Sequence, residues 1–379
     1  MKRLLFFGGT FDPPHVEHEN MLKAAVEEFS PDKTVVMPTF IPPHKQTLYC
    51  APPKCRLEMA KIAFGKIPTV TVDDFEIKAE GKSYSYITLG ALKAKYTDYE
   101  ILFLMGTDML SSFSSWKNPE EILRLCTPLL CVRSGEGETA QKTVSDFYGK
   151  FAVKPFVLSY EGKEVSSTEY KIYKMLGLPV CGEVDEKVEK YIDDKNLYLG
   201  DEKFEYIREN LKPERIKHTA GVVLYALKKC GYYGLDKTKV LTAALLHDCA
   251  KYKSAKDYPD FTMPEGVPAP VEHQYLGAYI AEKILGITDE EVLNAIRYHT
   301  SGRPNMSNLE KLVFTADMLE KGRTYDGAQE LRAAADKDFE TGFKLALVRS
   351  YDFVKISGKP IYGLTKKAIN YYLGDNYEF

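Results

Sequence analysis

Residues 2–29, KRLLFFGGTFDPPHVEHENMLKAAVEEF, decide the fold of the N-terminal half. An apolar run over residues 2–7 ends in a pair of glycines, two prolines follow, and apolar residues then recur at helical spacing over residues 16–29. A second apolar run occupies residues 33–37. Because two buried strands that are joined through a helix pair in parallel, this stretch predicts an open α/β sheet with its ligand crevice at the carboxyl ends of the strands.

The pattern of the chain changes near residue 200. Strand-like apolar runs continue at residues 69–73, 101–105, 129–132 and 156–158, with helical stretches between several of them. After the charged segment at residues 185–200, apolar residues follow helical spacing instead. The sequence therefore predicts an α/β domain over residues 1–199 and an all-α domain over residues 200–379.

Length and composition agree with two soluble domains. The 379 residues exceed what one ordinary core serves, and 44% hydrophobic with 28% charged residues is typical of globular proteins. A net charge of −3 and a pI near 6.2 disfavour nucleic acid and acidic membranes as partners. Seven scattered cysteines without a CxxC pair suggest reduced thiols, and no apolar stretch reaches the ~20 residues of a membrane helix. We expect a cytoplasmic protein that binds neither nucleic acid nor a membrane. Whether it forms a homo-oligomer stays open.

The seven histidines fall into two groups, which predict one site in each domain. The N-terminal group is His15, His18 and His44, and the C-terminal group is His218, His247, His273 and His299. The first two lie where the first strand gives way to a helix. Glycines there allow close approach to a phosphate, and a helix N-terminus attracts anions. Because His15 and His18 are three residues apart, both imidazoles can face one anion.

Residues 8–18, GGTFDPPHVEH, resemble the signature of nucleotidyltransferases with a [H/T]xGH motif, and most of all that of bacterial nicotinate-nucleotide adenylyltransferases. Further blocks follow in the order of that family: PPHK at 42–45, GKSYS at 81–85, GTD at 106–108 with Trp116, Arg133, and VSSTEYK at 165–171, which is similar to an ISSTxIR phosphate-binding turn. The resemblance covers about the first 200 residues and implies a Rossmann-like domain with a parallel sheet.

This resemblance implies a reaction of NAD biosynthesis. The phosphate of nicotinate mononucleotide attacks the α-phosphorus of ATP, giving nicotinate adenine dinucleotide and pyrophosphate, with magnesium carried by ATP. The nucleophile is already anionic, so the site must supply alignment and charge stabilisation, which the resemblance assigns to His15 and His18. The nucleotide-binding residues that it implies are Gly8, Gly9, Thr10, Phe11, Lys45, Ser83, Tyr84, Gly106, Asp108, Trp116, Arg133, Ser167, Thr168 and Lys171.

Two residues depart from the family pattern. Glu17 replaces the glycine before the second histidine and adds a negative charge where ATP is expected. Lys171 replaces the arginine that closes the phosphate-binding turn, so a bidentate fork is lost, and an ordinary solvated lysine is an equal interpretation. The alternative function is therefore a catalytically weakened, nucleotide-binding regulatory module.

The C-terminal group of histidines predicts a metal centre. His247 and Asp248 lie at the polar edge of an apolar helix, while His218, His273, His299 and Asp317 are spaced one per helix. Imidazole and carboxylate without thiolate suit iron, manganese or zinc. Six ligands exceed what one catalytic ion with open positions takes, so we expect two divalent metals bridged by Asp248 and hydrolysis of a phosphoester or phosphoanhydride.

The ordered pattern of these six residues resembles HD-domain phosphohydrolases. Four finer blocks resemble bacterial symmetrical diadenosine tetraphosphate hydrolases: HDCAK at 247–251, EHQYLGA at 272–278, IRYHTSGRPNM at 296–306 and ADMLEKGRTYDG at 316–327. The resemblance covers about residues 200–379 and implies a di-iron centre that releases two ADP. It implies catalysis by Asp248 and Lys251, polyphosphate contacts by Lys251, Arg303 and Arg323, and Thr300 or Tyr325 near the substrate.

Together the two halves predict a bifunctional enzyme whose partners are ATP, nicotinate mononucleotide and dinucleotide polyphosphates. Two alternatives concern the helical half, which could be a metal-stabilised interaction domain without turnover, or could hydrolyse guanosine tetraphosphate or cyclic nucleotides. The choice of nicotinate over nicotinamide mononucleotide also stays open.

Overall fold

The computed structural model describes residues 2–42, 48–180 and 182–374, which form two compact units. The first unit consists of Met1–Lys171 and Val180–Tyr198, and the second of Ile172–Pro179 and Leu199–Phe379. His44 and Lys45 of the sequence analysis lie outside the described residues.

The first unit is built on a parallel sheet, as the sequence predicts. Within the described residues this sheet has six strands in the order β3-β2-β1-β4-β5-β6, and every pairing is parallel. The strands are β1 (Lys2–Gly9), β2 (Lys33–Pro38), β3 (Val70–Val72), β4 (Tyr99–Gly106), β5 (Thr127–Arg133) and β6 (Phe156–Gly162).

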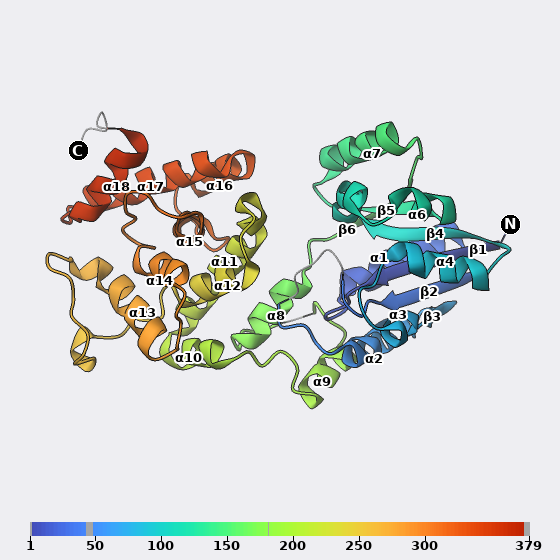
Figure 1. The fold of residues 1–379 in the computed structure, drawn as a ribbon, viewed down its shortest axis with the longest axis horizontal. Helices are drawn as coiled ribbons and strands as arrows, with labels where there is room; N and C mark the ends of the chain where they lie inside the picture. The colour runs from blue at the N-terminus through green and yellow to red at the C-terminus, as the bar shows by residue number, and fades with distance from the viewer. Residues whose placement is uncertain (1, 43–47, 181, 375–379) are drawn as a thin grey trace. The chain divides into compact units, whose positions relative to one another are not determined.

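Helices cover both faces of this sheet (Figure 1). On one face of the sheet, Phe6 belongs to an apolar cluster that is covered by α4, α5, α6 and α7. Phe7 points to the opposite face, where its ring lies 6.0 Å from that of Phe64 in α2. The central strand is therefore buried on both sides, which explains the unbroken apolar run at its core. The helices of this unit are α1 (Val16–Phe29), α2 (Pro53–Phe64), α3 (Phe75–Ala79), α4 (Ser85–Lys95), α5 (Thr107–Ser112), α6 (Pro119–Leu125), α7 (Gly137–Phe151) and α9 (Glu186–Asp194); α8 (Ser167–Met175) begins in this unit and ends in the second.

The order of the strands creates a switch point between β1 and β4. These two strands lie side by side, and the chain leaves β1 toward α1 on one face and β4 toward α5 on the other. In open α/β sheets the ligand crevice lies at such a point, outside the carboxyl ends of the strands. Gly9 ends β1 and Gly106 ends β4. The GGTFDPPHVEH and GTD motifs, which contain these glycines, therefore both reach this crevice.

The described residues of the second unit form helices and loops and contain no strand. Helix α12 lies at its centre, because every residue from Val240 to Leu246 is buried. The helices are α10 (Glu202–Asn210), α11 (Pro213–Lys229), α12 (Lys237–Leu246), α13 (Glu272–Lys283), α14 (Glu290–Arg297), α15 (Asn308–Leu319), α16 (Ala328–Lys337), α17 (Phe339–Ile356) and α18 (Gly363–Leu373). Among the described parts of both units, no helix combines the length and apolar character that a membrane crossing requires.

Candidate functional sites

His15 and His18 form a reciprocal cap at the start of α1. The backbone N–H of His18 donates to Nδ1 of His15 at 3.3 Å, and the backbone N–H of His15 donates to Nδ1 of His18 at 3.1 Å. Their rings stack with centroids 3.5 Å apart. Because each Nδ1 accepts a hydrogen bond, each neutral imidazole carries its proton on Nε2. The pair therefore offers two N–H donors, which suits an anion beside a helix N-terminus.

Gly9, which lies before this cap, has a packing role. Phe11 has a positive φ of 49° and a buried ring, which lies 5.4 Å from the His18 ring. A Cβ at Gly9 would lie 2.8 Å from the Phe11 ring, too close for any side chain. Gly9 thus allows Phe11 to fold back into the core, and only the backbone of Phe11 is left to reach a ligand.

Glu17, the first departure from the family pattern, is turned toward β6. Its Oε2 accepts hydrogen bonds of 2.8 Å from the Tyr160 hydroxyl and the Lys163 backbone N–H, and its Oε1 accepts one of 3.0 Å from Asn20. Burial opposes its ionisation, but these hydrogen bonds outweigh burial and lower the pKa of the Glu17 carboxyl. The carboxylate therefore has its own partners and ties α1 to β6.

Lys171, the second departure, is buried in an ion pair. Its Nζ lies 2.6 Å from Oδ2 of Asp12 and donates to the carbonyl of Leu48, also at 2.6 Å. Asp12 in turn accepts hydrogen bonds from the backbone N–H of Ala51 and the hydroxyl of Tyr198. The solvated alternative for Lys171 is therefore wrong, and the side chain joins α8 to the loop that carries His15.

Arg56 has a similar structural role that the sequence analysis missed. It is 1% exposed and donates to the carbonyls of Thr10, Thr39, Phe40 and Ala51, so it joins the loop after β1 to the loop after β2. Nothing in the local sequence distinguishes it from a surface arginine of α2.

Hydrogen bonds place two further motif blocks of the first unit beside the loops after β1 and β2. The hydroxyl of Ser83 accepts from the backbone N–H of Phe40, and the hydroxyl of Ser167 donates to the carbonyl of Pro13. These contacts bring the GKSYS and VSSTEYK blocks to the loops after β2 and β1. The Thr168 backbone N–H donates to the Ser166 hydroxyl at the start of α8.

A lysine that the sequence analysis did not predict lies beside Tyr84 of the GKSYS block. Lys117 Nζ lies 4.6 Å from the centroid of the Tyr84 ring, while Trp116 packs on Phe113 with centroids 5.1 Å apart. Asp108 is exposed in the first turn of α5, just after β4, and Arg133 is exposed at the end of β5.

In the second unit, the structure gathers the predicted metal ligands into two sets that share Asp248. One set is His218, His247 and Asp248, and the other is Asp248, His273 and His299; within each set the ligand atoms lie within 4.8 Å of one another. Asp317 joins the first set, because its Oδ1 lies 3.0 Å from Nε2 of His218. Asp248 itself is 2% exposed.

Hydrogen bonds outside the centre orient three of the imidazoles. Nδ1 of His247 donates to the carbonyl of Ala244 at 2.7 Å, and Nδ1 of His299 donates to the carbonyl of Ile296 at 2.8 Å. Nδ1 of His218 donates to Oε1 of Glu320 at 3.1 Å. Each ring therefore turns Nε2 toward the centre, as metal ligands with such partners do. The sequence analysis missed Glu320.

The inner atoms fit divalent cations. Nε2 of His273 lies 3.2 Å from Nε2 of His299 and 3.1 Å from Oδ1 of Asp248. Nε2 of His247 is buried and has no hydrogen-bond partner among the described residues. Converging lone pairs and a buried acceptor without a donor are what a metal ion satisfies.

The electrostatics of the centre agree with this fit. Burial lowers the pKa of His247 to about 3, so its imidazole is neutral at physiological pH. Burial would raise the pKa of Asp248, but the imidazoles of His247, His273 and His299 keep it well below its ordinary value. A neutral His247 beside an ionised Asp248 is the combination that binds metal, whereas hydrogen bonds to Asp317 and Glu320 outweigh burial and raise the pKa of His218 in the chain without metal.

Cations border this centre. Lys251 Nζ lies 3.3 Å from Oδ1 of Asp248, and Arg323 lies 2.6 Å from Oδ1 of Asp317. Arg215, which the sequence analysis missed, lies 2.8 Å from Oδ2 of Asp248. Its position one helical turn before His218 is the signal that could have identified it.

The other predicted substrate residues divide into two kinds. Thr300 lies at the centre, because its Oγ1 is 2.9 Å from Nε2 of His299. Arg303, in contrast, makes a bidentate ion pair with Glu310 at 2.6 and 2.9 Å. The hydroxyl of Tyr325 donates to the carbonyl of Met318.

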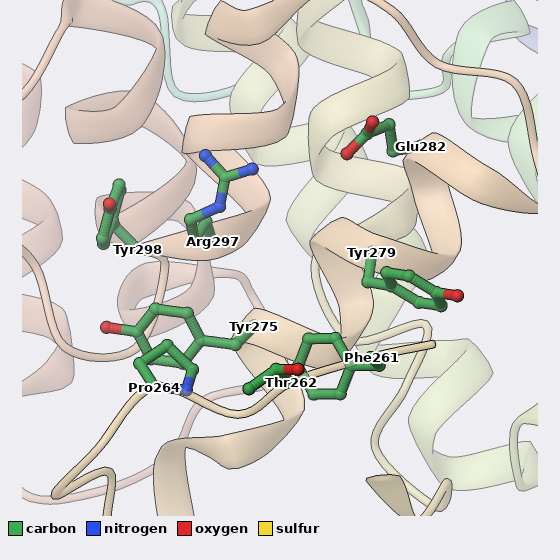
Figure 2. A pocket seen from close by; sticks show the side chains of 8 residues that line it. All are labelled: Phe261, Thr262, Pro264, Tyr275, Tyr279, Glu282, Arg297 and Tyr298. Atoms are coloured by element: carbon green, nitrogen blue, oxygen red, sulfur yellow. The ribbon is translucent and has the colours of Figure 1, made fainter. Parts of the chain in front are cut away.

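A separate cavity of about 320 Å³ lies beside α13 (Figure 2). Its lining includes Tyr275 and Tyr279 of α13, Tyr298 after α14 and Phe261 of the preceding loop. Tyr275 and Tyr279 follow His273 by two and six positions, which turns them to the opposite side of the helix. The cavity and the metal centre therefore lie on different faces of α13.

The fold and the two sites define a nucleotidyltransferase joined to an HD-type metal-dependent hydrolase. Residues 6–172 match the cytidylyltransferase-like family model, and residues 215–322 match the HD domain model. A probable nicotinate-nucleotide adenylyltransferase/Ap4A hydrolase of Mycoplasma pneumoniae is 29% identical over 90% of this chain and 97% of its own length.

Relatives of each half are more similar. A probable nicotinate-nucleotide adenylyltransferase of Clostridium botulinum is 34% identical over 50% of this chain and 96% of its own length. A symmetrical bis(5'-nucleosyl)-tetraphosphatase of Bacillus subtilis is 31% identical over 44% of this chain and 92% of its own length. The chain belongs to the nicotinate-nucleotide adenylyltransferase family in its N-terminal half and to the symmetrical bis(5'-nucleosyl)-tetraphosphatases in its C-terminal half.

Proposed function

We propose that the first unit transfers the adenylyl group of ATP to nicotinate mononucleotide and that the second unit hydrolyses diadenosine tetraphosphate to two ADP. The names of the relatives support the pair of reactions, and each site has the groups that its reaction needs. In both reactions the protein handles phosphate charge, with N–H donors in the first unit and with divalent metals in the second.

The stacked pair of His15 and His18 carries the first proposal. The attacking phosphate is anionic, so no base is required, and the two Nε2–H groups donate to phosphate oxygens as charge develops on the α-phosphate. The buried pair of Asp12 and Lys171 holds the turn that presents them. Magnesium arrives with ATP.

The test is pyrophosphate release from ATP and nicotinate mononucleotide by the full chain. We expect turnover that requires both substrates and that falls when nicotinamide mononucleotide replaces the nicotinate form. A rate equal to that of the His18→Ala variant would instead favour the regulatory module. The Glu17 carboxylate accepts hydrogen bonds from Tyr160 and Lys163, so its negative charge is directed away from the expected ATP site. This arrangement favours an active adenylyltransferase over a regulatory module.

The two ligand sets that share Asp248 carry the second proposal. His218, His247, Asp248 and Asp317 would hold one divalent metal, and Asp248, His273 and His299 the other. The family suggests iron, and manganese or zinc suits the same donors. When bound, such a pair supplies Lewis acidity to a phosphoryl oxygen and lowers the pKa of water. Lys251 and Arg323 donate to the polyphosphate, and Thr300 lies beside the reacting group.

Elemental analysis and product identification test this proposal together. We expect two metal equivalents per chain and ADP as the product from diadenosine tetraphosphate, with activity lost in Asp248→Ala. Bound metal without turnover would indicate an interaction domain. Faster turnover of guanosine tetraphosphate or a cyclic nucleotide would identify that nucleotide as the substrate instead.

A cytoplasmic location also stays a proposal. It is supported by Cys55, Cys126, Cys131, Cys230 and Cys249, which form no disulfide within the described residues.

A further inference from the structure

We propose that Arg215 binds a phosphate of the substrate at the mouth of the metal centre, in the role that the sequence suggests for Arg303. This inference rests on the proposed function of the second unit, because it assigns a residue to the phosphate subsite of that reaction.

Arg215 lies at the border between the buried centre and solvent. It is in the first turn of α11, three residues before His218, so both side chains project from one face of the helix. Its Nη1 lies 2.8 Å from Oδ2 of Asp248, and its side chain is 24% exposed, whereas that of Asp248 is 2% exposed. The guanidinium thus reaches the shared ligand from the solvent side.

Most of the hydrogen-bonding capacity of Arg215 is unused. A guanidinium carries five N–H donors in a fork that matches phosphate geometry. Within the described parts of the chain, the bond to Asp248 is the one polar side-chain contact of Arg215. When Asp248 shares its charge with metals, its attraction for Arg215 weakens, and the fork is available to an incoming anion.

Arg215 and Lys251 flank the same carboxylate. Lys251 lies 3.3 Å from Oδ1 of Asp248 and its side chain is 30% exposed, so one cation borders each oxygen of Asp248. A polyphosphate that reaches the metals from solvent passes between them. Their positive charges offset the repulsion between the phosphate chain and the carboxylates of the centre.

Arg303 contrasts with Arg215 in the use of its donors. Its Nε and Nη2 both donate to Glu310, and its guanidinium lies 4.8 Å from the centroid of the Tyr298 ring. Glu310 is 1% exposed, so releasing Arg303 to a substrate would leave a buried carboxylate without its ion-pair partner. Arg303 therefore has a structural role, joining the segment after α14 to Glu310 of α15, while Arg215 is available to the substrate.

The experiment measures the affinity of the metal-loaded full chain for ADP by calorimetry, together with its metal content and its KM and kcat for diadenosine tetraphosphate. The variants are Arg215→Met, which removes the charge, and Arg215→Lys, which keeps it without the fork. Lys217→Met is the matched control, because it removes one charge from an exposed position of the same helix, two residues away and so on another face.

We expect Arg215→Met to weaken ADP binding and raise KM by about tenfold to a hundredfold, the loss for a charge-assisted hydrogen bond, with two metals retained. Arg215→Lys should recover part of this loss, and Lys217→Met should stay within about twofold, as for a rim charge screened by salt. Unchanged ADP affinity in Arg215→Met, or a loss of metal that parallels the loss of binding, would overturn the assignment.

The outcome separates this inference from the proposed reaction. If the wild-type chain leaves diadenosine tetraphosphate intact but Arg215→Met weakens ADP binding, the phosphate assignment stands and the substrate is wrong. If the wild-type chain hydrolyses it and Arg215→Met behaves as Lys217→Met does, the reaction stands and Arg215 is not a binding residue.

Discussion

His15 and His247 carry their ring protons on opposite nitrogens, because each ring bonds to the backbone at a different end of a helix. His15 is at the N-terminus of α1, where unpaired backbone N–H groups make Nδ1 an acceptor and leave the proton on Nε2. His247 is at the C-terminus of α12, where an unpaired carbonyl takes the Nδ1 proton and leaves a lone pair on Nε2. The same side chain thus presents an N–H donor, which suits an anion, in one unit and a lone pair, which suits a metal cation, in the other.

Asp248→Asn should give the largest effect and should be confined to one unit. An amide keeps the size of the side chain but loses the charge that both ligand sets share. We expect metal content to fall and hydrolysis of diadenosine tetraphosphate to drop at least about a thousandfold, because metals contribute several kcal/mol to such reactions. Adenylyl transfer by the first unit is the internal control. Full metal content with full hydrolysis would refute the shared-ligand centre.

Lys171→Met should give the largest loss of stability. It leaves Asp12 charged and buried, which costs about 3 kcal/mol in the free energy of unfolding. Asp12→Asn should cost a similar amount, and the double variant should cost less than the two singles together, since no lone charge remains. Chemical denaturation followed by fluorescence measures this coupling. Strict additivity would mean that Lys171 and Asp12 do not form the pair.

His15→Asn separates the two roles of the first histidine. Asparagine is a preferred N-cap whose amide oxygen accepts as Nδ1 does, so the stability of α1 should be kept. The Nε2–H donor is lost, and we expect kcat for adenylyl transfer to fall by about a hundredfold, as when one transition-state donor is removed. Steady-state kinetics with a thermal melt checks both parts. An unchanged kcat would show that the donor arrangement at this helix end is not used.

The sequence predicted the parallel sheet, the helical second unit and the residues that the structure gathers around Asp248, because each rests on periodicity or on a spaced pattern. It could not predict which charged groups pair in the interior. The sequence does not distinguish Arg56 from Arg215, yet Arg56 donates to four backbone carbonyls and Arg215 pairs with Asp248. Partner choice depends on tertiary contacts between distant segments, which periodicity does not carry.

Glu320→Gln tests how the partner of a histidine affects metal binding in the second unit. Glu320 accepts the Nδ1 proton of His218, and a carboxylate in that place makes Nε2 a stronger ligand. The amide keeps the hydrogen bond and loses the charge, so we expect metal affinity to fall by about tenfold, the lower end for changes of this kind. Competition with a chelator of known affinity measures it. Equal affinity in both proteins would mean that the ring orientation alone matters.

Glu17→Gln should give the smallest effect, and its pH dependence has a definite sign. Because the pKa of Glu17 is lower in the folded chain than its ordinary value of 4.5, its contribution to stability is present above pH 4.5 and disappears as the pH falls through the folded value. We expect a loss of about 1.5 kcal/mol at pH 7, the lower end for hydrogen bonds to a charged group, and almost none near pH 3. Adenylyl transfer at pH 7 should change little, because the carboxylate is engaged with β6 and not with ATP. A large gain in ATP affinity in this variant would instead place the charge of Glu17 in the path of the nucleotide and restore the regulatory interpretation of the first unit.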